Sequence, residues 1–224
     1  MTAMDLKRSD IIPINYDAGQ ATGIRCSNTV RERCRMITDR LPRSKALLDE
    51  FGKSDRITSL ALPEDGRLVA LAKSIEEAML SEKRQIVSRA CQEFLAASAD
   101  FYGVPTPTVR VLASRPLRLY ESGWRTELFG DYEPEKNLIR VWMRTSVRKQ
   151  VTSFGTFLST LCHEFCHQLD FQLFGFRDSP HTRGFYERAA LFYHHARGTP
   201  KKQLFWRKLG DRFRVDWVRV RTGV

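Results

Sequence analysis

Two histidines four residues apart, with a glutamate beside the first, could together carry metal chemistry in this sequence. They lie in residues 161–170, which read LCHEFCHQLD and contain His163, Glu164 and His167 as an HExxH motif. In a helix, residues four apart lie on the same face, so both imidazoles can bind one metal ion. Imidazole nitrogen suits zinc. Glu164 then lies beside the metal, where it can accept a proton from a zinc-bound water whose pKa the metal lowers toward neutrality.

A catalytic zinc site needs a third protein ligand and one open coordination position. The candidate is His181, which follows His167 by 14 residues and precedes the next expected helix. Three acidic residues are the alternatives: Asp170, Asp178 and Glu187. Ligand chemistry and spacing both favour the histidine. The sequence therefore predicts Zn²⁺ bound by His163, His167 and His181, with Glu164 as the general base.

Two other interpretations of this segment stay open. The histidines could line a buried helix and hydrogen-bond locally, with no metal between them. Alternatively, Cys162 and Cys166 could bind a metal as thiolates, since they too are four residues apart. Their face is rotated by about 100° from the histidine face and lies close to the apolar stripe of the helix. We therefore expect both cysteines to be buried as small hydrophobic residues.

Hydrophobic periodicity divides the chain into helices and a short β-rich region. It predicts helices at Ser27–Leu41, Ala46–Phe51, Leu68–Phe101, Phe154–Leu169 and Arg183–Arg197, of which the third is one bent helix or two. Strands are predicted at Thr108–Leu112, Arg125–Phe129 and Asn137–Met143. The polar residues 130–136 between the last two strands are typical of a hairpin connection. This order of elements predicts an α+β fold with a small antiparallel sheet.

Residues 163–189, HEFCHQLDFQLFGFRDSPHTRGFYERA, resemble the active-site region of the SprT-like zinc metallopeptidases, the Spartan-related zincins. In that family a spacer of a dozen or so residues separates HExxH from a third histidine, and an aromatic residue follows four positions later. His181 and Phe185 match this pattern, whereas Thr182 stands where a glycine often follows the histidine. The resemblance covers roughly residues 85–197. It implies a zincin-like fold with an HExxH active-site helix, three histidine ligands and a glutamate base.

We divide the chain into three parts on this basis. Residues 1–66 are expected to be an N-terminal extension that is partly helical or loose, residues 67–197 the SprT-like zincin catalytic domain, and residues 198–224 a C-terminal segment. The expected function is zinc-dependent hydrolysis of peptide bonds in a protein or peptide substrate, which could pair with an edge strand near residues 125–143. The alternative is a zinc-containing nucleic-acid-binding or regulatory protein with little or no proteolysis.

The positive charge of the chain is concentrated near its C-terminal end. The formal net charge is +11, and residues 196–224 carry nine Lys and Arg against two Asp and Glu. These basic residues are interleaved with Phe205, Trp206, Phe213 and Trp217. Basic and aromatic side chains together are typical of a surface that binds single-stranded nucleic acid, which makes DNA a candidate partner. The other interpretation is a closing helix and a final strand whose aromatic residues face inward.

Composition also gives an expected location. No stretch of 18 apolar residues occurs, so we expect no membrane-spanning helix and no membrane partner. The first residues lack the apolar core of a secretory signal, and the five cysteines include no CxxC pair. A cytoplasmic protein with reduced thiols is therefore expected.

Two further histidines and two tyrosines could also take part in chemistry. His194 and His195 are expected at the surface or at a helix C-terminus, where a protonated imidazole interacts favourably with the helix dipole. Tyr186 and Tyr193 could donate a hydrogen bond to an oxyanion, but nothing in the sequence positions either hydroxyl. We expect both rings to pack.

Overall fold

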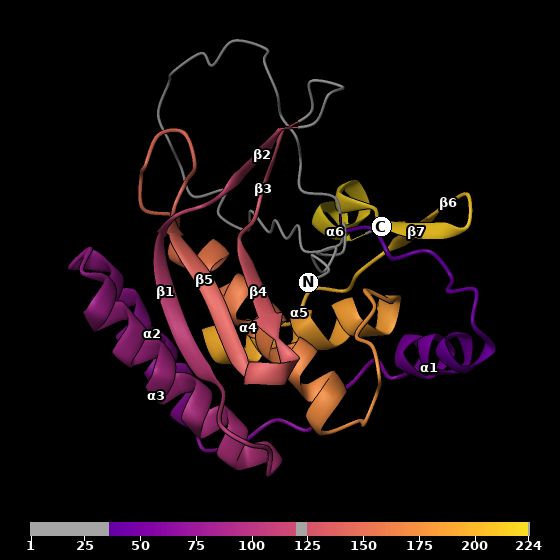
Figure 1. The fold of residues 1–224 in the computed structure, drawn as a ribbon, viewed down its shortest axis with the longest axis horizontal. Coiled ribbons are helices and arrows are strands. Elements are labelled where there is room, and N and C mark those ends of the chain that lie inside the picture. Colours follow the sequence, from indigo (N-terminus) through magenta and orange to yellow (C-terminus); the bar gives the residue numbers. More distant parts are fainter. Residues whose placement is uncertain (1–35, 120–124, 224) are drawn as a thin grey trace, which may run out of the picture.

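The computed structural model describes residues 36–119 and 125–223, whose arrangement is drawn in Figure 1. The described helices are α1 (Lys45–Arg56), α2 (Arg67–Leu80), α3 (Arg84–Tyr102), α4 (Phe154–Gln172), α5 (Arg183–Arg197) and α6 (Trp217–Thr222). The strands are β1 (Thr108–Ser114), β2 (Leu117–Leu119), β3 (Arg125–Glu127), β4 (Gly130–Glu133), β5 (Leu138–Arg144), β6 (Trp206–Leu209) and β7 (Arg212–Val215). The predicted α+β class is confirmed. None of the described helices has the length and apolar character needed to cross a membrane.

The main sheet is mixed, which corrects the prediction of an antiparallel sheet. Its order is β1-β5-β4, in which β4 is antiparallel and β1 parallel to β5. β2 continues from β1 and pairs with β3, which leads back into β4 (Figure 1). β1 and β2 thus run out along one arm of a long hairpin, and β3 and β4 run back along the other. β2 and β3 pair directly with each other, whereas β1 and β4 are separated by β5, which pairs with both. Because β1 and β4 run in opposite directions, a strand antiparallel to β4 has to be parallel to β1.

The hairpin before α4 does not have the predicted strands, because Arg125–Glu127 (β3) pairs with β2, and β5 pairs with residues from the predicted turn. Gly130–Glu133 is itself strand β4, and the connection to β5 consists of a 3₁₀ turn at Pro134–Lys136 followed by Asn137. Asn137 has a φ of +45°, in the left-handed region that asparagine tolerates. The Asn137 side chain accepts a hydrogen bond from the Tyr132 hydroxyl at 3.1 Å, which ties the turn to β4.

Two helix predictions in the first half of the chain differ from the structure, and a third is decided by it. Of the two alternatives for Leu68–Phe101, one bent helix or two, the structure has two helices, because Glu82 takes a φ of +53° between α2 and α3. α1 continues past Gly52, where an end was predicted, and its last turn contains the fully buried Ser54. Most of the predicted helix Ser27–Leu41 lies outside the described residues. Its described part is extended instead of helical, and Ile37 forms a β-bridge with Arg214.

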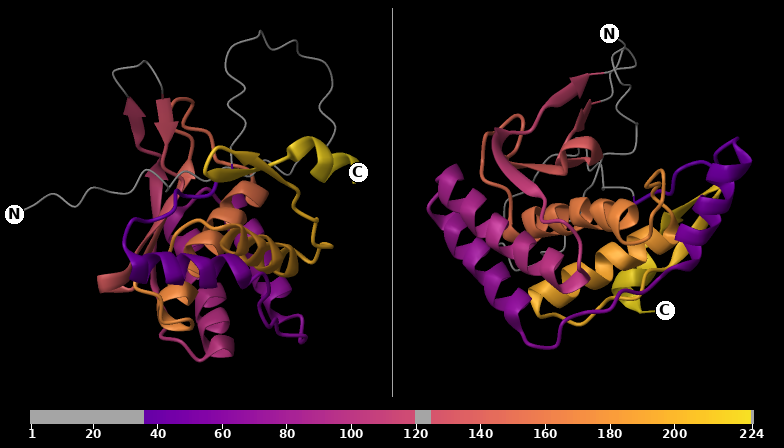
Figure 2. Two further views of the ribbon diagram at one scale, coloured as in Figure 1. Left: turned by 90° about the vertical axis from the view of Figure 1, so that its right-hand side faces the viewer. Right: turned by 60° about the horizontal axis from the view of Figure 1, so that its bottom comes forward.

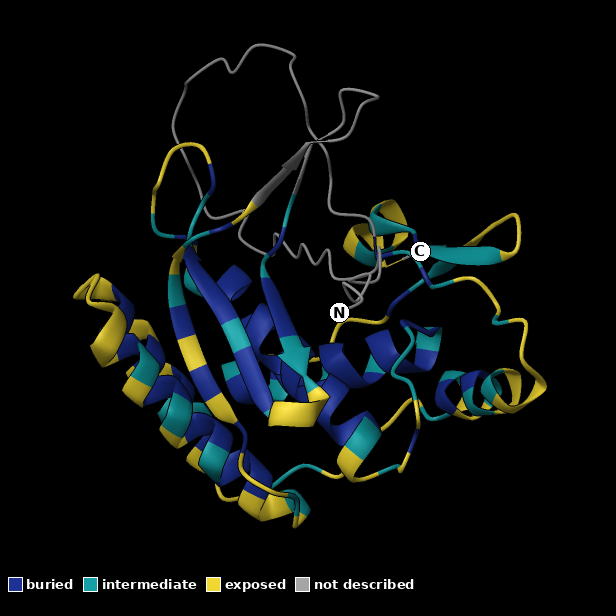
Figure 3. Cartoon of the chain, in the orientation of Figure 1, coloured by how far each residue is buried: buried dark blue, intermediate teal, exposed yellow. Residues whose placement is uncertain are grey.

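The helices cover one face of the main sheet. α3 packs against β1 and α4 packs against β4 and β5, while α2 and α5 lie behind them (Figure 2). The strand residues that face these helices are spaced two apart, as the pleat requires. They are Val109, Val111, Ile139, Val141 and Met143, all buried in the main core. α4 lies between the sheet and α5, and it is the most completely buried helix of the fold (Figure 3).

α1 packs against α5, on the side of the molecule away from α2 and α3 (Figures 1 and 2). The contact is close at Gly184, where an added Cβ would lie 2.1 Å from the carbonyl oxygen of Ser54. A glycine is needed there because no side chain fits between the C-terminal carbonyls of α1 and the first turn of α5. The described part of the N-terminal extension is therefore held directly against the segment that follows the third histidine.

Candidate metal centre

α4 places the HExxH residues in the interior of the molecule. The helix begins after Ser153, whose hydroxyl oxygen accepts a hydrogen bond from the Thr156 N–H and so caps the first turn. Every residue from Gly155 to Asp170 is buried, so the side chains on each face of the helix contact protein. His163 and His167 occupy one of these faces, as their spacing predicts.

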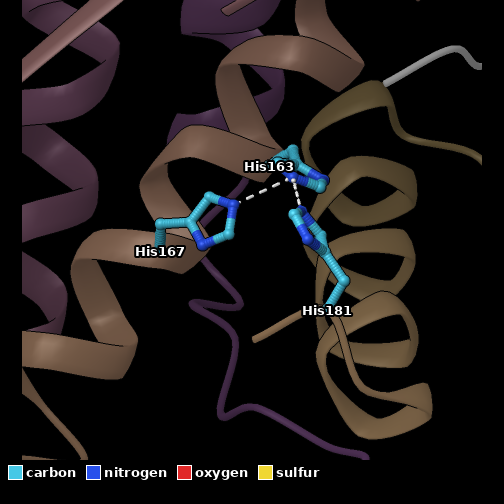
Figure 4. Close-up of side chains that lie close together, drawn as sticks. All are labelled: His163, His167 and His181. Carbon is cyan, nitrogen blue, oxygen red and sulfur yellow. Dashed lines mark hydrogen bonds between the residues drawn. The ribbon is translucent and has the colours of Figure 1, made fainter. Parts of the chain in front are cut away.

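The imidazoles of His163, His167 and His181 converge (Figure 4). Nε2 of His163 lies 2.9 Å from Nε2 of His181 and 3.0 Å from Nε2 of His167. Two nitrogens bound at about 2.1 Å to one tetrahedral zinc are about 3.4 Å apart, so only a small outward movement separates this arrangement from a coordination shell. The three side chains are 1–8% exposed. They are therefore a group that could hold a metal ion.

Burial keeps this site in the form that binds metal. It lowers the pKa of His163 well below the usual range, and the neighbouring imidazoles of His167 and His181 add to the effect. A neutral imidazole offers a nitrogen lone pair to a cation, whereas a protonated one cannot. Three imidazoles and no carboxylate make up the donor set within the described residues.

The first turn of α5 fixes the third histidine. Thr182 caps this helix, because its hydroxyl oxygen accepts the Phe185 N–H at 3.0 Å. The Phe185 ring is fully buried and lies 4.7, 4.4 and 5.1 Å from the rings of the three histidines, in chain order. Phe185 therefore packs against the whole cluster. The cap also explains why threonine is accommodated directly after His181.

A series of buried hydrogen bonds through Ser179, Asp170 and Arg188 orients His167 at its Nδ1 atom. Its Nδ1 lies 2.7 Å from the hydroxyl of Ser179, which donates to Asp170 at 2.8 Å. Asp170 in turn accepts from Arg188 at 2.7 Å, and both side chains are almost completely buried. Burial raises the pKa of Asp170, and the Arg188 guanidinium opposes that shift. Because Ser179 donates to Asp170, its oxygen accepts the Nδ1–H of His167, which leaves Nε2 unprotonated toward the cluster.

Glu164 is buried next to the sheet. Its side chain is packed so closely on β4 that a Cβ added at Gly130 would lie 2.8 Å from Glu164 Oε1. The Glu164 side chain therefore lies against the start of β4.

The alternative ligands named from the sequence are engaged elsewhere. Asp170 belongs to the series of hydrogen bonds that orients His167, Glu187 pairs with Lys201 at 2.8 Å, and Asp178 accepts the N–H of Ser179. Cys162 and Cys166 are buried and carry free thiols, as predicted. Burial raises the pKa of both thiols, so they stay protonated and are poor metal ligands.

The Tyr186 ring stacks on His181, but the hydroxyls of Tyr186 and Tyr193 are both engaged in hydrogen bonds to other groups. The Tyr186 hydroxyl donates to the carbonyl of Ile37 at 3.1 Å, and that of Tyr193 accepts from Arg197 at 2.9 Å. Both tyrosine rings are buried, as expected. His194 and His195 are in the last turn of α5, but His194 is buried, which corrects the surface alternative.

Sequence reasoning missed three residues of the site: Asp39, Gly130 and Ser179. Asp39 accepts the His181 N–H at 2.9 Å from 142 residues away, and no local pattern relates the two positions. Gly130 was placed in a turn. Only Ser179 had an available signal, since it lies two residues before a candidate ligand.

Comparison with known proteins assigns no family: no family model, no curated protein and no solved structure matches this chain. The histidine cluster and its surroundings are therefore the basis on which a function can be proposed.

Proposed function

We propose that the protein is a zinc-dependent metallopeptidase with a zincin-like fold, related to the SprT-like enzymes. The observation that carries this proposal is the convergence of three imidazole side chains, with Glu164 next to the first of them on α4. Three histidine ligands suit zinc, and a three-ligand set leaves a position for water or substrate, as catalytic zinc sites require. The resemblance of residues 163–189 to the SprT-like active site, including the aromatic Phe185, supports the same proposal.

Two chemical tasks of peptide hydrolysis, metal binding and general-base catalysis, then have residues in this chain. Zinc held by the three histidines would supply Lewis acidity toward the scissile carbonyl and the attacking water. Glu164 would accept the proton of that water and later deliver it to the leaving amine. Its packing against β4 supports this role, because it restricts the position of the carboxylate.

The proposed substrate is an extended segment of a protein or peptide. Among the described strands, β4 is at one edge of the main sheet and pairs only with β5. An extended peptide could therefore add to the other side of β4 through main-chain hydrogen bonds. Since Gly130 of β4 lies against Glu164, such a peptide would run alongside the proposed base. Its scissile bond would then reach the metal centre.

Glu164→Gln tests the proposal, because it removes the base and leaves the three histidines. The wild-type protein should bind about one zinc per chain and cleave a labelled unfolded protein such as casein. Glu164→Gln should keep its zinc and lose activity by at least about 10²-fold, the usual contribution of a general base. His181→Ala should lose both. Zinc content would be measured by inductively coupled plasma mass spectrometry, and equal cleavage by Glu164→Gln would refute the proposal. Zinc binding without any cleavage would favour the binding or regulatory alternative.

Nucleic acid is the further partner that we propose, at the C-terminal segment (residues 198–224). This segment adjoins the metal centre, since the Trp206 ring contacts Tyr186, which stacks on His181. Lys208 and Arg221 are among its exposed basic residues. Its aromatic rings are partly buried in the fold, which supports the structural interpretation of these rings and favours phosphate contacts over base stacking.

A further inference from the structure

Residues 36–39 run from the hairpin β6–β7 to the histidine cluster and form one β-bridge on the way, between Ile37 and Arg214. The Thr38 N–H donates to the carbonyl of Phe213 at 2.9 Å, and the Phe213 N–H donates to the Thr38 hydroxyl at 2.9 Å. One residue further, the Asp39 N–H donates to the carbonyl of His181 at 2.8 Å. The N-terminal extension is thus joined to β7 on one side and to the third histidine on the other.

The Asp39 carboxylate faces both the backbone and the ring of His181. Oδ2 accepts the His181 N–H at 2.9 Å and lies 3.4 Å from Nδ1 of the same residue. Within the described part of the chain this buried Nδ1 makes no hydrogen bond of normal geometry. Asp39 is therefore the anionic group placed to receive the Nδ1 proton, on the side of the ring opposite to the converging Nε2.

Tyr186 contacts both residues 36–39 and the imidazole of His181. Its hydroxyl donates to the carbonyl of Ile37 at 3.1 Å, and its ring stacks on His181 at a centroid distance of 5.5 Å. Asp39 is thus held near the imidazole by its own hydrogen bonds to the His181 backbone and by the contact of Tyr186 with Ile37. Asp39 keeps 31% of its side chain exposed, so solvent partly screens its charge.

We propose that Asp39 is a positioning residue for His181, and that the N-terminal extension thereby completes the metal site. The inference rests on the proposed metal-binding function. A cation on Nε2 makes the Nδ1–H a stronger donor, so metal binding draws the 3.4 Å contact into a hydrogen bond that fixes tautomer and ring orientation. Ser179 and Asp170 do the same for His167. His181 therefore has the carboxylate of Asp39 on its Nδ1 side, and His167 has that of Asp170, reached through Ser179.

Zinc affinity tests this role without any activity assay. The dissociation constant would be measured by competition with a chromogenic chelator for the wild-type protein, Asp39→Ala and Asp39→Asn. Asp39→Ala should weaken zinc binding about 10- to 100-fold, as is typical when the partner of a ligating histidine is removed. Asp39→Asn should lose less, because its amide oxygen can still accept the His181 N–H. The visible absorption of the cobalt-substituted protein should change in both variants, since the His181 ring is then less firmly oriented.

Glu50→Gln is the matched control. Glu50 lies in the same extension on α1 and pairs with Arg177 away from the histidines, so its removal should leave zinc affinity and the cobalt spectrum unchanged. Wild-type affinity and spectrum in Asp39→Asn would overturn the inference even if Asp39→Ala failed to fold. If the wild-type protein bound no zinc, the proposed function and this inference would both fall. Zinc binding that depends on Asp39, in a protein without proteolysis, would support the inference while removing the peptidase proposal.

Discussion

Gly130 determines how closely β4 approaches the catalytic candidate on α4. A Cβ at this position would lie 2.6 Å from Thr160 Cγ2 and 2.9 Å from Glu164 Cγ. Both distances are too short for a real contact. Thr160 is held because its hydroxyl donates to the Thr156 carbonyl at 2.9 Å. Any side chain at position 130 therefore has to displace Glu164, β4 or both.

Gly130→Ala should consequently lower peptidase activity and leave metal binding intact. A displacement of about 1 Å in a catalytic group can cost about 10²-fold in rate, and we expect a loss of kcat/KM of that order with unchanged zinc content. Gly52→Ala is the control, because its added Cβ would meet only the flexible end of Arg56 at 3.4 Å. Parallel assays of both variants on the same labelled protein measure the difference. Equal activity would show that Glu164 tolerates the displacement.

The three histidines of the cluster and Phe185 could be predicted because their spacing along the chain forms a pattern. His163 and His167 share a helical face, and His181 and Phe185 follow at a regular interval. Asp39 could not be predicted, since its contact with His181 depends on how an extension folds back over the chain.

At the scale of elements, the ion pair between Asp170 and Arg188 joins α4 to α5 and α1. Arg188 donates to Asp170 and also to the carbonyl oxygens of Ser54 and Ile57 at the end of α1. The guanidinium thus satisfies carbonyls that α1 leaves without an intrahelical donor. The strength of this junction depends on the Asp170 charge, because a buried cation without a partner is costly.

Asp170→Ala should therefore destabilise the metal-free protein by about 3–5 kcal/mol, the usual cost of leaving one member of a buried ion pair alone. Urea unfolding in the presence of a chelator measures the change without a contribution from metal. Glu187→Gln removes the more accessible pair with Lys201 and should change stability by less than about 1 kcal/mol. If both substitutions changed the free energy of unfolding by less than about 1 kcal/mol, the prediction would be contradicted, because Arg188 would not depend on Asp170 to compensate its charge.

The C-terminus of α5 should make stability depend on pH. His194 bonds to the Thr199 hydroxyl at 2.8 Å, and burial, together with Lys202, Arg197 and Lys201, lowers its pKa from 6.5 to about 4. Between these values the unfolded chain binds a proton that the folded protein does not, so stability falls as pH decreases from about 6.5 to about 4.

His194→Asn should flatten that dependence, since asparagine can replace the hydrogen bond but does not titrate. The unfolding temperature of the metal-free protein, measured at a series of pH values, would show whether the dependence is flatter in His194→Asn. Identical profiles for the wild type and His194→Asn would contradict the assignment.

The helices that carry the site could be predicted from periodicity, but the parallel pairing of β1 with β5 could not. Hydrophobic alternation identifies a strand and its buried face, and it does not state which neighbour the strand selects. Insertion of β5 into an opened hairpin is a tertiary event. It places β4 at the sheet edge, next to Glu164.

At the scale of the whole molecule, segments from both ends of the described chain meet at the third histidine. Residues 36–39 lie between β7 and His181, and Trp206 of β6 contacts Tyr186 beside it. Composition alone identified the C-terminal segment as basic, but it could not show that this segment adjoins the metal centre. A ligand that binds the C-terminal segment would therefore lie close to a substrate at the metal.

Binding of nucleic acid to this segment should depend steeply on salt. For single strands, log Kobs falls with log salt by about 0.7 for each phosphate neutralised. The double variant Lys208→Gln/Arg221→Gln should therefore reduce the slope by up to about 1.4 and weaken binding at low salt. Lys73→Gln/Arg84→Gln is the control of equal net charge, since both residues are exposed on α2 and α3, far from β6 and α6 (Figure 1).

Fluorescence anisotropy with a labelled single-stranded oligonucleotide would measure each slope. Equal slopes for the two double variants would place any binding outside the C-terminal segment, and binding independent of salt would exclude a phosphate-directed surface.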